Sequence, residues 1–296
     1  MLVPDNTPVC IKTLSPPAAE AAKVMLDILR ADLLHPVISG NKWYKLRYYL
    51  EAAEKKQVKM IVTFGGAWSN HIVATAAACQ WKNIPCAGII RGEAPPHLSA
   101  TLQEAASYGM QLHFFSREDF RLKKIPAGLD HPDHLIIPEG GYGPDGARGA
   151  ATMLDGFETE KYTHLICAVG TGTMVAGLQQ RSSPHQQVIG IPVLKAGPGI
   201  EDQILPLTIK GHGQLQLIHD YHFGGYAKKT DTLIRFMNEW YDITSTPSDL
   251  VYTGKMFYAV NDLLQKEFFP AGSHILLIHS GGLQGNYSLP KGTLNY

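Results

Sequence analysis

The sequence predicts an α/β protein built from two open, twisted sheets. Seven short runs of apolar, β-branched and aromatic residues recur along the chain, separated by amphipathic stretches. This is the pattern of buried parallel strands that alternate with helices. Small and hydroxyl residues directly follow several of these runs, as they do at the strand-to-helix turns of such sheets. The length of 296 residues corresponds to about two domains at roughly 150 residues each.

The predicted strands are short and bounded by turn residues. One further stretch, Val24–Arg30, fits either a helix or a strand, and its periodicity alone does not decide between them. The predicted strands are Met60–Phe64, Cys86–Ile90, Gln111–Phe115, His134–Pro138, His164–Val169, Gln187–Val193 and His274–His279.

The predicted helices have apolar residues at helical spacing. Between the fourth and fifth strands, the stretch Pro138–Gly149 is dense in Gly and Pro and predicts a loop or a crossing between domains. The predicted helices are Lys42–Lys56, Ser69–Trp81, Leu98–Tyr108, Ala147–Phe157, Gly172–Gln180, Thr230–Trp240 and Gly254–Glu267.

Composition argues against several classes of partner. The 26 basic residues balance the 26 acidic ones, so the net charge is zero and no basic field favours nucleic acid or an anionic membrane. The most apolar stretch, Leu165–Leu178, is shorter than the ~20 residues that a membrane helix needs. The first 15 residues contain Pro4, Asp5 and Pro8 where a signal peptide would have an apolar region. We therefore expect a soluble, cytoplasmic protein.

Cysteine and histidine spacing predicts neither a disulfide framework nor a metal centre. The four cysteines form no CxxC pair. His131 and His134, in the stretch HPDH, lack the HExxH or CxxC partners of a zinc site, so we expect no metal.

Three strand-to-helix junctions carry glycine and hydroxyl residues, which is where open α/β sheets bind ligands. They read TFGGAWSNH, AVGTGTMVAG and HSGGLQGN. In the second, Gly170, Thr171, Gly172 and Thr173 fit a nest of N–H and hydroxyl donors for a phosphate group. The sequence contains no Walker A loop and no matching GxGxxG fingerprint. A purely structural turn and a nucleotide-binding module remain alternatives.

Two lysines open the predicted helix in SGNKWYKLRYYLEAA. Lys42 and Lys45 lie within one turn of its N-terminus, where positive charge opposes the helix dipole. Such a position lowers a lysine pKa toward the neutral amine that Schiff-base chemistry requires. A solvated helix end is the alternative interpretation of the same spacing.

From about Leu26 to its C-terminus, the chain resembles the 1-aminocyclopropane-1-carboxylate deaminase and D-cysteine desulfhydrase family. These are pyridoxal-phosphate enzymes of the tryptophan-synthase β-like fold. The resemblance rests on seven motifs in family order: GNKWYKL, GGAWSNH, PEGGYG, VGTGTMVAG, GGYA, VYTGKM and FFPAGSHILLIHSGG. It favours a strand over Val24–Arg30. It also implies a smaller domain of residues 45–152, a larger one of residues 1–44 plus 153–296, and a homodimer.

The resemblance implies roles for the cofactor-side residues. Lys42 matches the lysine that forms the Schiff base with pyridoxal phosphate, and Lys45 its neighbour on the phosphate side. Asn70 matches the residue that holds the phenolic oxygen of the cofactor. Gly170, Thr171, Gly172 and Thr173 match the phosphate loop.

The resemblance also implies roles on the substrate side. Ser69, Asn70 and His71 match the loop at the substrate carboxylate, and Ser69 lies beside the reacting carbon. Tyr226 and Tyr252 match two active-site tyrosines, one lining the substrate side and the other packed on the cofactor ring. Which of the two serves as an acid is left open.

Two positions distinguish the branches of the family. The deaminase pattern has a glutamate against the pyridine nitrogen, and Thr253 stands there in this chain. The deaminase pattern HLGG reads HSGG here, with Ser280. Both resemble the desulfhydrase branch, so we expect elimination on a small D-amino acid, with D-cysteine giving pyruvate, ammonia and sulfide. The alternatives are 1-aminocyclopropane-1-carboxylate deamination to 2-oxobutyrate and a non-catalytic pyridoxal-phosphate-binding protein.

Overall fold

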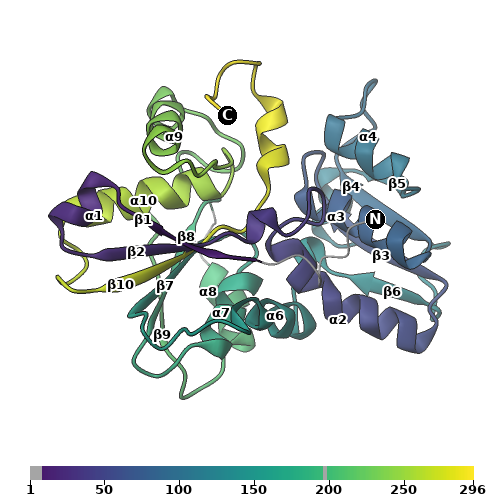
Figure 1. Cartoon of the computed structure of the whole chain (residues 1–296). Helices are drawn as coiled ribbons and strands as arrows, with labels where there is room; N and C mark the ends of the chain where they lie inside the picture. Colours follow the sequence, from purple (N-terminus) through teal and green to yellow (C-terminus); the bar gives the residue numbers. More distant parts are fainter. Residues whose placement is uncertain (1–8, 196–198) are drawn as a thin grey trace.

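The computed structural model describes residues 9–195 and 199–296, which form two sheets flanked by helices (Figure 1). The larger sheet has the strand order β1-β2-β10-β7-β8-β9 and the smaller one β5-β4-β3-β6. Strand β1 runs antiparallel to β2, and all other paired strands are parallel. The strands are β1 Ile11–Leu14, β2 Met25–Leu29, β3 Met60–Gly65, β4 Cys86–Arg91, β5 Gln111–Phe115, β6 His134–Ile137, β7 His164–Val169, β8 Gln187–Pro192, β9 Gln214–Leu217 and β10 His274–Ile278.

Helices cover both faces of the larger sheet. Figure 1 shows α9 and α10 on one side of it and α6, α7 and α8 on the other. The smaller sheet packs against α2, α3 and α4 through a second apolar core. The helices are α1 Pro17–Ala21, α2 Asn41–Lys56, α3 Asn70–Lys82, α4 Ala100–Ser107, α5 Arg117–Arg121, α6 Pro144–Ala151, α7 Thr173–Arg181, α8 Ile200–Ile204, α9 Asp231–Thr244 and α10 Thr253–Gln265.

The predicted α/β fold class is confirmed, and each of the seven predicted strands is present to within one or two residues. The stretch Val24–Arg30 forms β2, as the resemblance indicates. The edge strands β1 and β9 were not predicted. Each has only four residues, which is too short for a clear alternation of apolar and polar side chains.

The prediction of a loop over Pro138–Gly149 is wrong for its second half, where α6 begins at Pro144. Proline favours the first position of a helix, because its missing N–H is not needed there. The glycines of α6 serve close packing. A Cβ on Gly149 would lie 2.0 Å from the Tyr44 carbonyl oxygen of α2, and one on Gly177 of α7 would lie 2.5 Å from the Ala147 carbonyl oxygen. Glycine at these points therefore lets α2 and α7 approach α6 closely.

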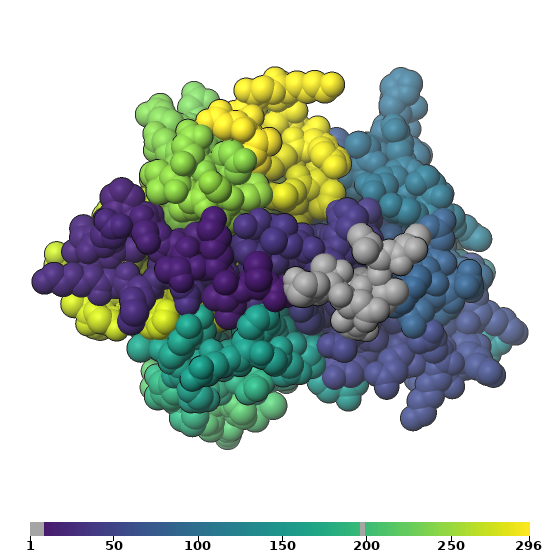
Figure 2. Space-filling view, viewed as in Figure 1, coloured from purple at the N-terminus to yellow at the C-terminus, as the bar shows by residue number. Residues whose placement is uncertain are grey.

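The two sheets lie in separate parts of the molecule, and the C-terminal segment reaches from one to the other. Figure 2 shows this segment, in yellow, lying against the part that carries the smaller sheet, in blue. The strands of the smaller sheet fall within residues 60–137. The domain bounds stay a prediction, and the one at residue 45 lies inside α2. In the part of the chain that is described, no helix is long and apolar enough to cross a membrane.

Candidate active site

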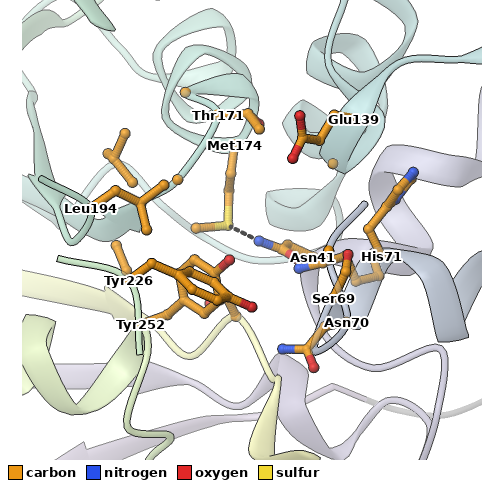
Figure 3. Close-up of a pocket in the computed structure, with 18 of the residues that line it drawn as sticks. Asn41, Ser69, Asn70, His71, Glu139, Thr171, Met174, Leu194, Tyr226 and Tyr252 are labelled. Carbon is orange, nitrogen blue, oxygen red and sulfur yellow. Dashed lines mark hydrogen bonds between the residues drawn. The ribbon is translucent and has the colours of Figure 1, made fainter. Parts of the chain in front are cut away.

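A cavity of about 390 Å³ opens between the two sheets, at the carboxyl ends of β3, β4, β7, β8 and β10 (Figure 3). This is the edge where parallel sheets present their strand-to-helix turns. Eleven of the thirteen residues predicted for the site line the cavity, whereas Thr173 and Thr253 do not. The eleven are Lys42, Lys45, Ser69, Asn70, His71, Gly170, Thr171, Gly172, Tyr226, Tyr252 and Ser280.

Lys42 lies in the first turn of α2, directly after a tightly packed turn. Gly40 has φ +56, and a Cβ there would meet the Ser280 carbonyl oxygen at 2.0 Å, so only glycine fits. The Lys42 ammonium donates to Asn41 Oδ1 at 2.5 Å and lies 5.8 Å from the centre of the Tyr252 ring. Burial lowers the pKa of Lys42 to about 8, and the charge of Asp249 partly opposes this shift.

Lys45 enters the same cavity one turn further along α2. Burial, followed by the neighbouring charge of Lys42, lowers the pKa of Lys45 to about 7. Two buried amines in one cavity repel each other when both are charged. An anionic group between Lys45 and the glycine-rich turn would remove this penalty.

Reaction of Lys42 with an aldehyde is therefore expected to depend on pH in a defined way. Only the neutral amine attacks a carbonyl group, and a pKa of about 8 predicts a rate that rises with pH and levels off above about pH 8. Stopped-flow absorbance measures this rate with pyridoxal phosphate, the aldehyde that the resemblance implies, and protein free of cofactor. Pyridoxal lacks the phosphate group that the resemblance places beside Lys45. It should therefore bind more weakly, with the same pH at the midpoint of its rate profile. A rate that still climbs toward pH 10.5 would contradict the lowered pKa.

The glycine-rich turn after β7 lines the same cavity as Lys45. Gly172 has φ +82, and a Cβ there would lie 2.3 Å from Ile204, so glycine is required. The Thr171 and Thr173 hydroxyls lie 3.1 Å apart. Thr173 is fully buried behind the turn. The free N–H groups at the start of α7 and the Thr171 hydroxyl thus form an anion-binding cradle.

The SNH motif caps α3 on the opposite wall. The Ser69 side chain accepts a hydrogen bond from the Ile72 N–H at 3.4 Å. Asn70 donates to the Gly282 carbonyl oxygen at 3.4 Å. Its Oδ1 atom is buried and has no hydrogen-bond partner among the described residues. A buried amide oxygen of this kind needs a donor, which a bound group can supply.

His71 is neutral and has a fixed tautomer. Burial, reinforced by the charges of Lys42 and Lys45, lowers its pKa to about 3. The Thr63 hydroxyl donates to the Ile137 carbonyl oxygen at 2.9 Å, so it accepts from His71 Nε2 at 2.8 Å. His71 Nδ1 therefore bears a lone pair, and it has no partner within the described chain. The His71 ring can accept a hydrogen bond but offers no charge to a substrate carboxylate.

The two tyrosines reach the cavity from the side of the larger sheet (Figure 3). The Tyr252 ring packs on the glycine-rich turn, because a Cβ on Gly170 would lie 3.2 Å from its Cε1 atom. Tyr226 is 36% exposed at the mouth, and its hydroxyl donates to the Trp68 carbonyl oxygen at 3.3 Å across the cleft. Burial raises the pKa of both phenols, so both stay protonated at neutral pH.

Ser280 lies in the loop after β10, which contacts the GNK motif on one side of the cavity and the SNH motif on the other. Its carbonyl oxygen accepts from the Asn41 N–H at 3.1 Å. The preceding His279 is buried, which lowers its pKa, and its Nδ1 accepts from the Gly281 N–H at 3.3 Å. The His279 ring thus helps to hold the HSGG turn against the GNK motif.

Thr253 lies behind the cavity wall and bonds to a buried carboxylate. Its hydroxyl donates to Asp249 Oδ1 at 2.8 Å and accepts from the Asp249 N–H at 2.8 Å. The hydroxyl proton is therefore already used, and a contact with a cofactor ring nitrogen stays a prediction. The structure adds Asn41, Arg91, Glu139, Met174 and Leu194 to the lining. Glu139 and Met174 lie within the motifs PEGGYG and VGTGTMVAG, which gave them no role, and Asn41 adjoins Lys42. No sequence motif pointed to Arg91 or Leu194.

The described residues contain no group of three or more His, Cys, Asp or Glu side chains arranged to hold a metal ion.

Comparison with known proteins agrees with this geometry. The model of the family described as pyridoxal-phosphate dependent enzymes matches residues 15–281. The chain belongs to this family. Its cofactor is thus pyridoxal phosphate.

Three similar proteins bear related names. One from Pyrococcus horikoshii, provisionally named a 1-aminocyclopropane-1-carboxylate deaminase, is 28% identical over 280 residues, 88% of this chain and 85% of that protein. The Arabidopsis thaliana bifunctional D-cysteine desulfhydrase/1-aminocyclopropane-1-carboxylate deaminase, mitochondrial, is 26% identical over 88% of this chain and 73% of its own. The crystal structure of an ACC deaminase homologue superposes with a TM-score of 0.81 and 26% identity, covering 95% of this chain and 91% of that one.

The cavity residues fit pyridoxal phosphate. The cradle of Thr171 and Gly172, together with Lys45, would hold the phosphate group, which satisfies the free donors described above. The phenolic hydroxyl group would donate a hydrogen bond to the unpartnered Asn70 Oδ1. Lys42 would supply the amine for the covalent link.

Proposed function

We propose that the protein is a lyase that eliminates the β-substituent of a small D-amino acid, with D-cysteine as the best candidate. In this reaction D-cysteine and water give pyruvate, ammonia and hydrogen sulfide. The Cα–H and Cβ–S bonds break, the sulfur leaves with the bonding electrons, and water replaces the nitrogen. No external oxidant or reductant is needed.

The observation that carries the proposal is the position of Ser280 on the cavity wall, in the loop that contacts both GNK and SNH. The resemblance associates leucine at this position with the deaminases. A hydroxyl in its place leaves polar space for a thiol substituent. The name of the bifunctional relative from Arabidopsis is consistent with this chemistry.

Different residues of this chain would carry out the separate steps of the elimination. Bound pyridoxal phosphate supplies the electron sink. The free N–H groups at the start of α3, beside Ser69, would hold the substrate carboxylate. Lys42, with its lowered pKa, would take the proton from Cα. Tyr252 would serve as the platform, and Tyr226 would line the substrate side.

The test is sulfide release from D-cysteine, with L-cysteine in parallel, by protein reconstituted with pyridoxal phosphate. We expect release from the D-isomer and a loss of at least about tenfold in Ser280→Leu, which removes the hydroxyl and fills the polar space. Ser288→Leu is the matched control, since Ser288 lies outside the cavity lining. Comparable release from both cysteine isomers would refute the stereochemical part of the proposal.

A second candidate is 1-aminocyclopropane-1-carboxylate deamination, which the relative from Pyrococcus horikoshii favours by its name. Release of 2-oxobutyrate at a rate equal to or above that of sulfide would reverse our ranking. A bound cofactor whose absorbance shifts with no amino acid would instead indicate a non-catalytic protein. The homodimer and the cytoplasmic location stay predictions.

A further inference from the structure

A buried lysine outside the cavity lining holds together two segments that line it. Lys255, in the first turn of α10, has no exposed surface. Its ammonium donates to the carbonyl oxygens of Gly225 at 2.7 Å, His222 at 2.9 Å and Val193 at 3.1 Å. These three bonds use all the donors that an ammonium has. Among the residues described, no carboxylate lies within ion-pair distance of it, and positive charge in this turn opposes the helix dipole.

The turn that this ammonium holds has an unfavourable backbone. Phe223 has φ +51 and Ala227 has φ +50, and the two glycines between them have φ +84 and +114. Left-handed conformations are costly for residues with a Cβ, and they persist where surrounding contacts fix them. Two of the three carbonyl groups bonded to Lys255 belong to this turn. The ammonium thus supplies contacts that compensate for the strain.

The same turn places Tyr226, whose hydroxyl crosses the cleft to the Trp68 carbonyl oxygen. The third carbonyl group belongs to Val193, which directly follows β8 and precedes Leu194 and Lys195 on the cavity wall. The two segments touch, since a Cβ on Gly225 would lie 3.1 Å from the Cβ of Lys195. Figure 3 shows Leu194 and Tyr226 on the same side of the pocket. A single cation therefore binds both of these segments of the cavity wall.

We propose that the three carbonyl groups form a site for a small monovalent ammonium cation, which Lys255 fills from within the chain, and that Lys255 is the positioning residue for Tyr226. The proposal rests on the proposed function only for the role of Tyr226 in turnover. A site of this kind should accept a free alkylammonium ion when the lysine side chain is shortened.

The test uses the holoenzyme of Lys255→Ala with n-propylammonium chloride, whose atoms replace those removed beyond Cβ. We expect kcat/KM for D-cysteine to fall on the order of a hundredfold, because Tyr226 is no longer held. Propylammonium should restore at least about tenfold of this loss and raise the Tm of the variant. Tetramethylammonium, which has no N–H donor, should do neither. Wild type in the same salts reports any reaction of the amine with the cofactor. Lys266→Met, at the residue that directly follows α10, is the control for loss of a lysine.

Equal effects of the two salts on Lys255→Ala, or wild-type kcat/KM in that variant, would overturn the proposal. Should Lys255→Ala fail to fold, Lys255→Met keeps the length of the side chain without its donors. Hydrogen exchange of residues 222–227 is then expected to speed up relative to wild type, and unchanged exchange would also overturn the proposal. If wild type does not release sulfide, the proposed function fails, yet the Tm and exchange measurements still judge the cation site.

Discussion

Lys42→Ala is expected to abolish turnover and the visible absorbance of the bound cofactor together. In the proposed function a single amine, that of Lys42, forms the covalent link and takes the Cα proton, so this substitution removes both roles at once. Loss of a general base alone costs about 10²–10⁴-fold in rate, and we expect at least the upper end. The measurements are the absorbance spectrum of the reconstituted variant and single-turnover product release.

Lys45→Ala is the matched control, because it removes a second buried amine from the same helix and cavity. It should keep the absorbance band of the covalent link while binding pyridoxal phosphate more weakly. The opposite pattern, with the band retained in Lys42→Ala and lost in Lys45→Ala, would exchange the roles of the two lysines. Retention of the band in both variants would mean that neither lysine forms the link.

The sequence is enough to predict the motifs whose local structure is specified by neighbouring residues. A glycine, a hydroxyl residue and a helix start specify the turn at residues 170–173, and two lysines in one helical turn mark the wall opposite it. Strands β3, β7 and β10 are predictable because they are buried on both faces and read as continuous apolar runs. These features are enough to place the cavity at the carboxyl edge of the sheets from the sequence alone.

The buried residues that hold this geometry from outside the cavity lining belong to no sequence pattern that predicts their role. Lys255 and Asp249 are charged residues near a helix start, which a sequence cannot distinguish from solvated ones. Their burial arises from contacts between distant segments, such as Lys255 with Val193, 62 positions away. Thr253 illustrates the same limit. Its position in the motif suggested a cofactor contact, but its hydroxyl bonds to Asp249 four residues earlier.

Asp249→Ala is expected to cause the largest loss of stability near the site. The fully buried carboxylate accepts the N–H groups of Val251, Tyr252 and Thr253 as well as the Thr253 hydroxyl, at 2.8–2.9 Å. Alanine leaves these donors without an acceptor, at a cost of about 3–5 kcal/mol in the free energy of unfolding. For a chain of this size, that corresponds to a Tm lower by about 10 °C. Calorimetry of the apoprotein measures it.

Two further variants separate the acceptor from its charge. Asp249→Asn keeps one carbonyl oxygen as an acceptor and should lose about half as much stability. Asp242→Ala is the control, because that exposed carboxylate bonds only to the Asn295 side chain among the described residues. A Tm of Asp249→Ala within about 2 °C of wild type would show that water or a shifted backbone satisfies the three N–H groups.

The charge of Asp249 also acts on Lys42, so the effects of substituting these two residues are linked. Its negative charge favours the protonated form of Lys42 and partly opposes the lowering of that pKa by burial. Removing the charge therefore lowers the pKa of Lys42 further, so the midpoint for pyridoxal phosphate binding should move below about pH 8 in both Asp249 variants. Because Asp249→Asn retains much of the local structure, a shift in that variant reports electrostatics and not a displaced helix. An unchanged midpoint in Asp249→Asn would mean that Asp249 holds the backbone around Tyr252 but does not affect the pKa of Lys42.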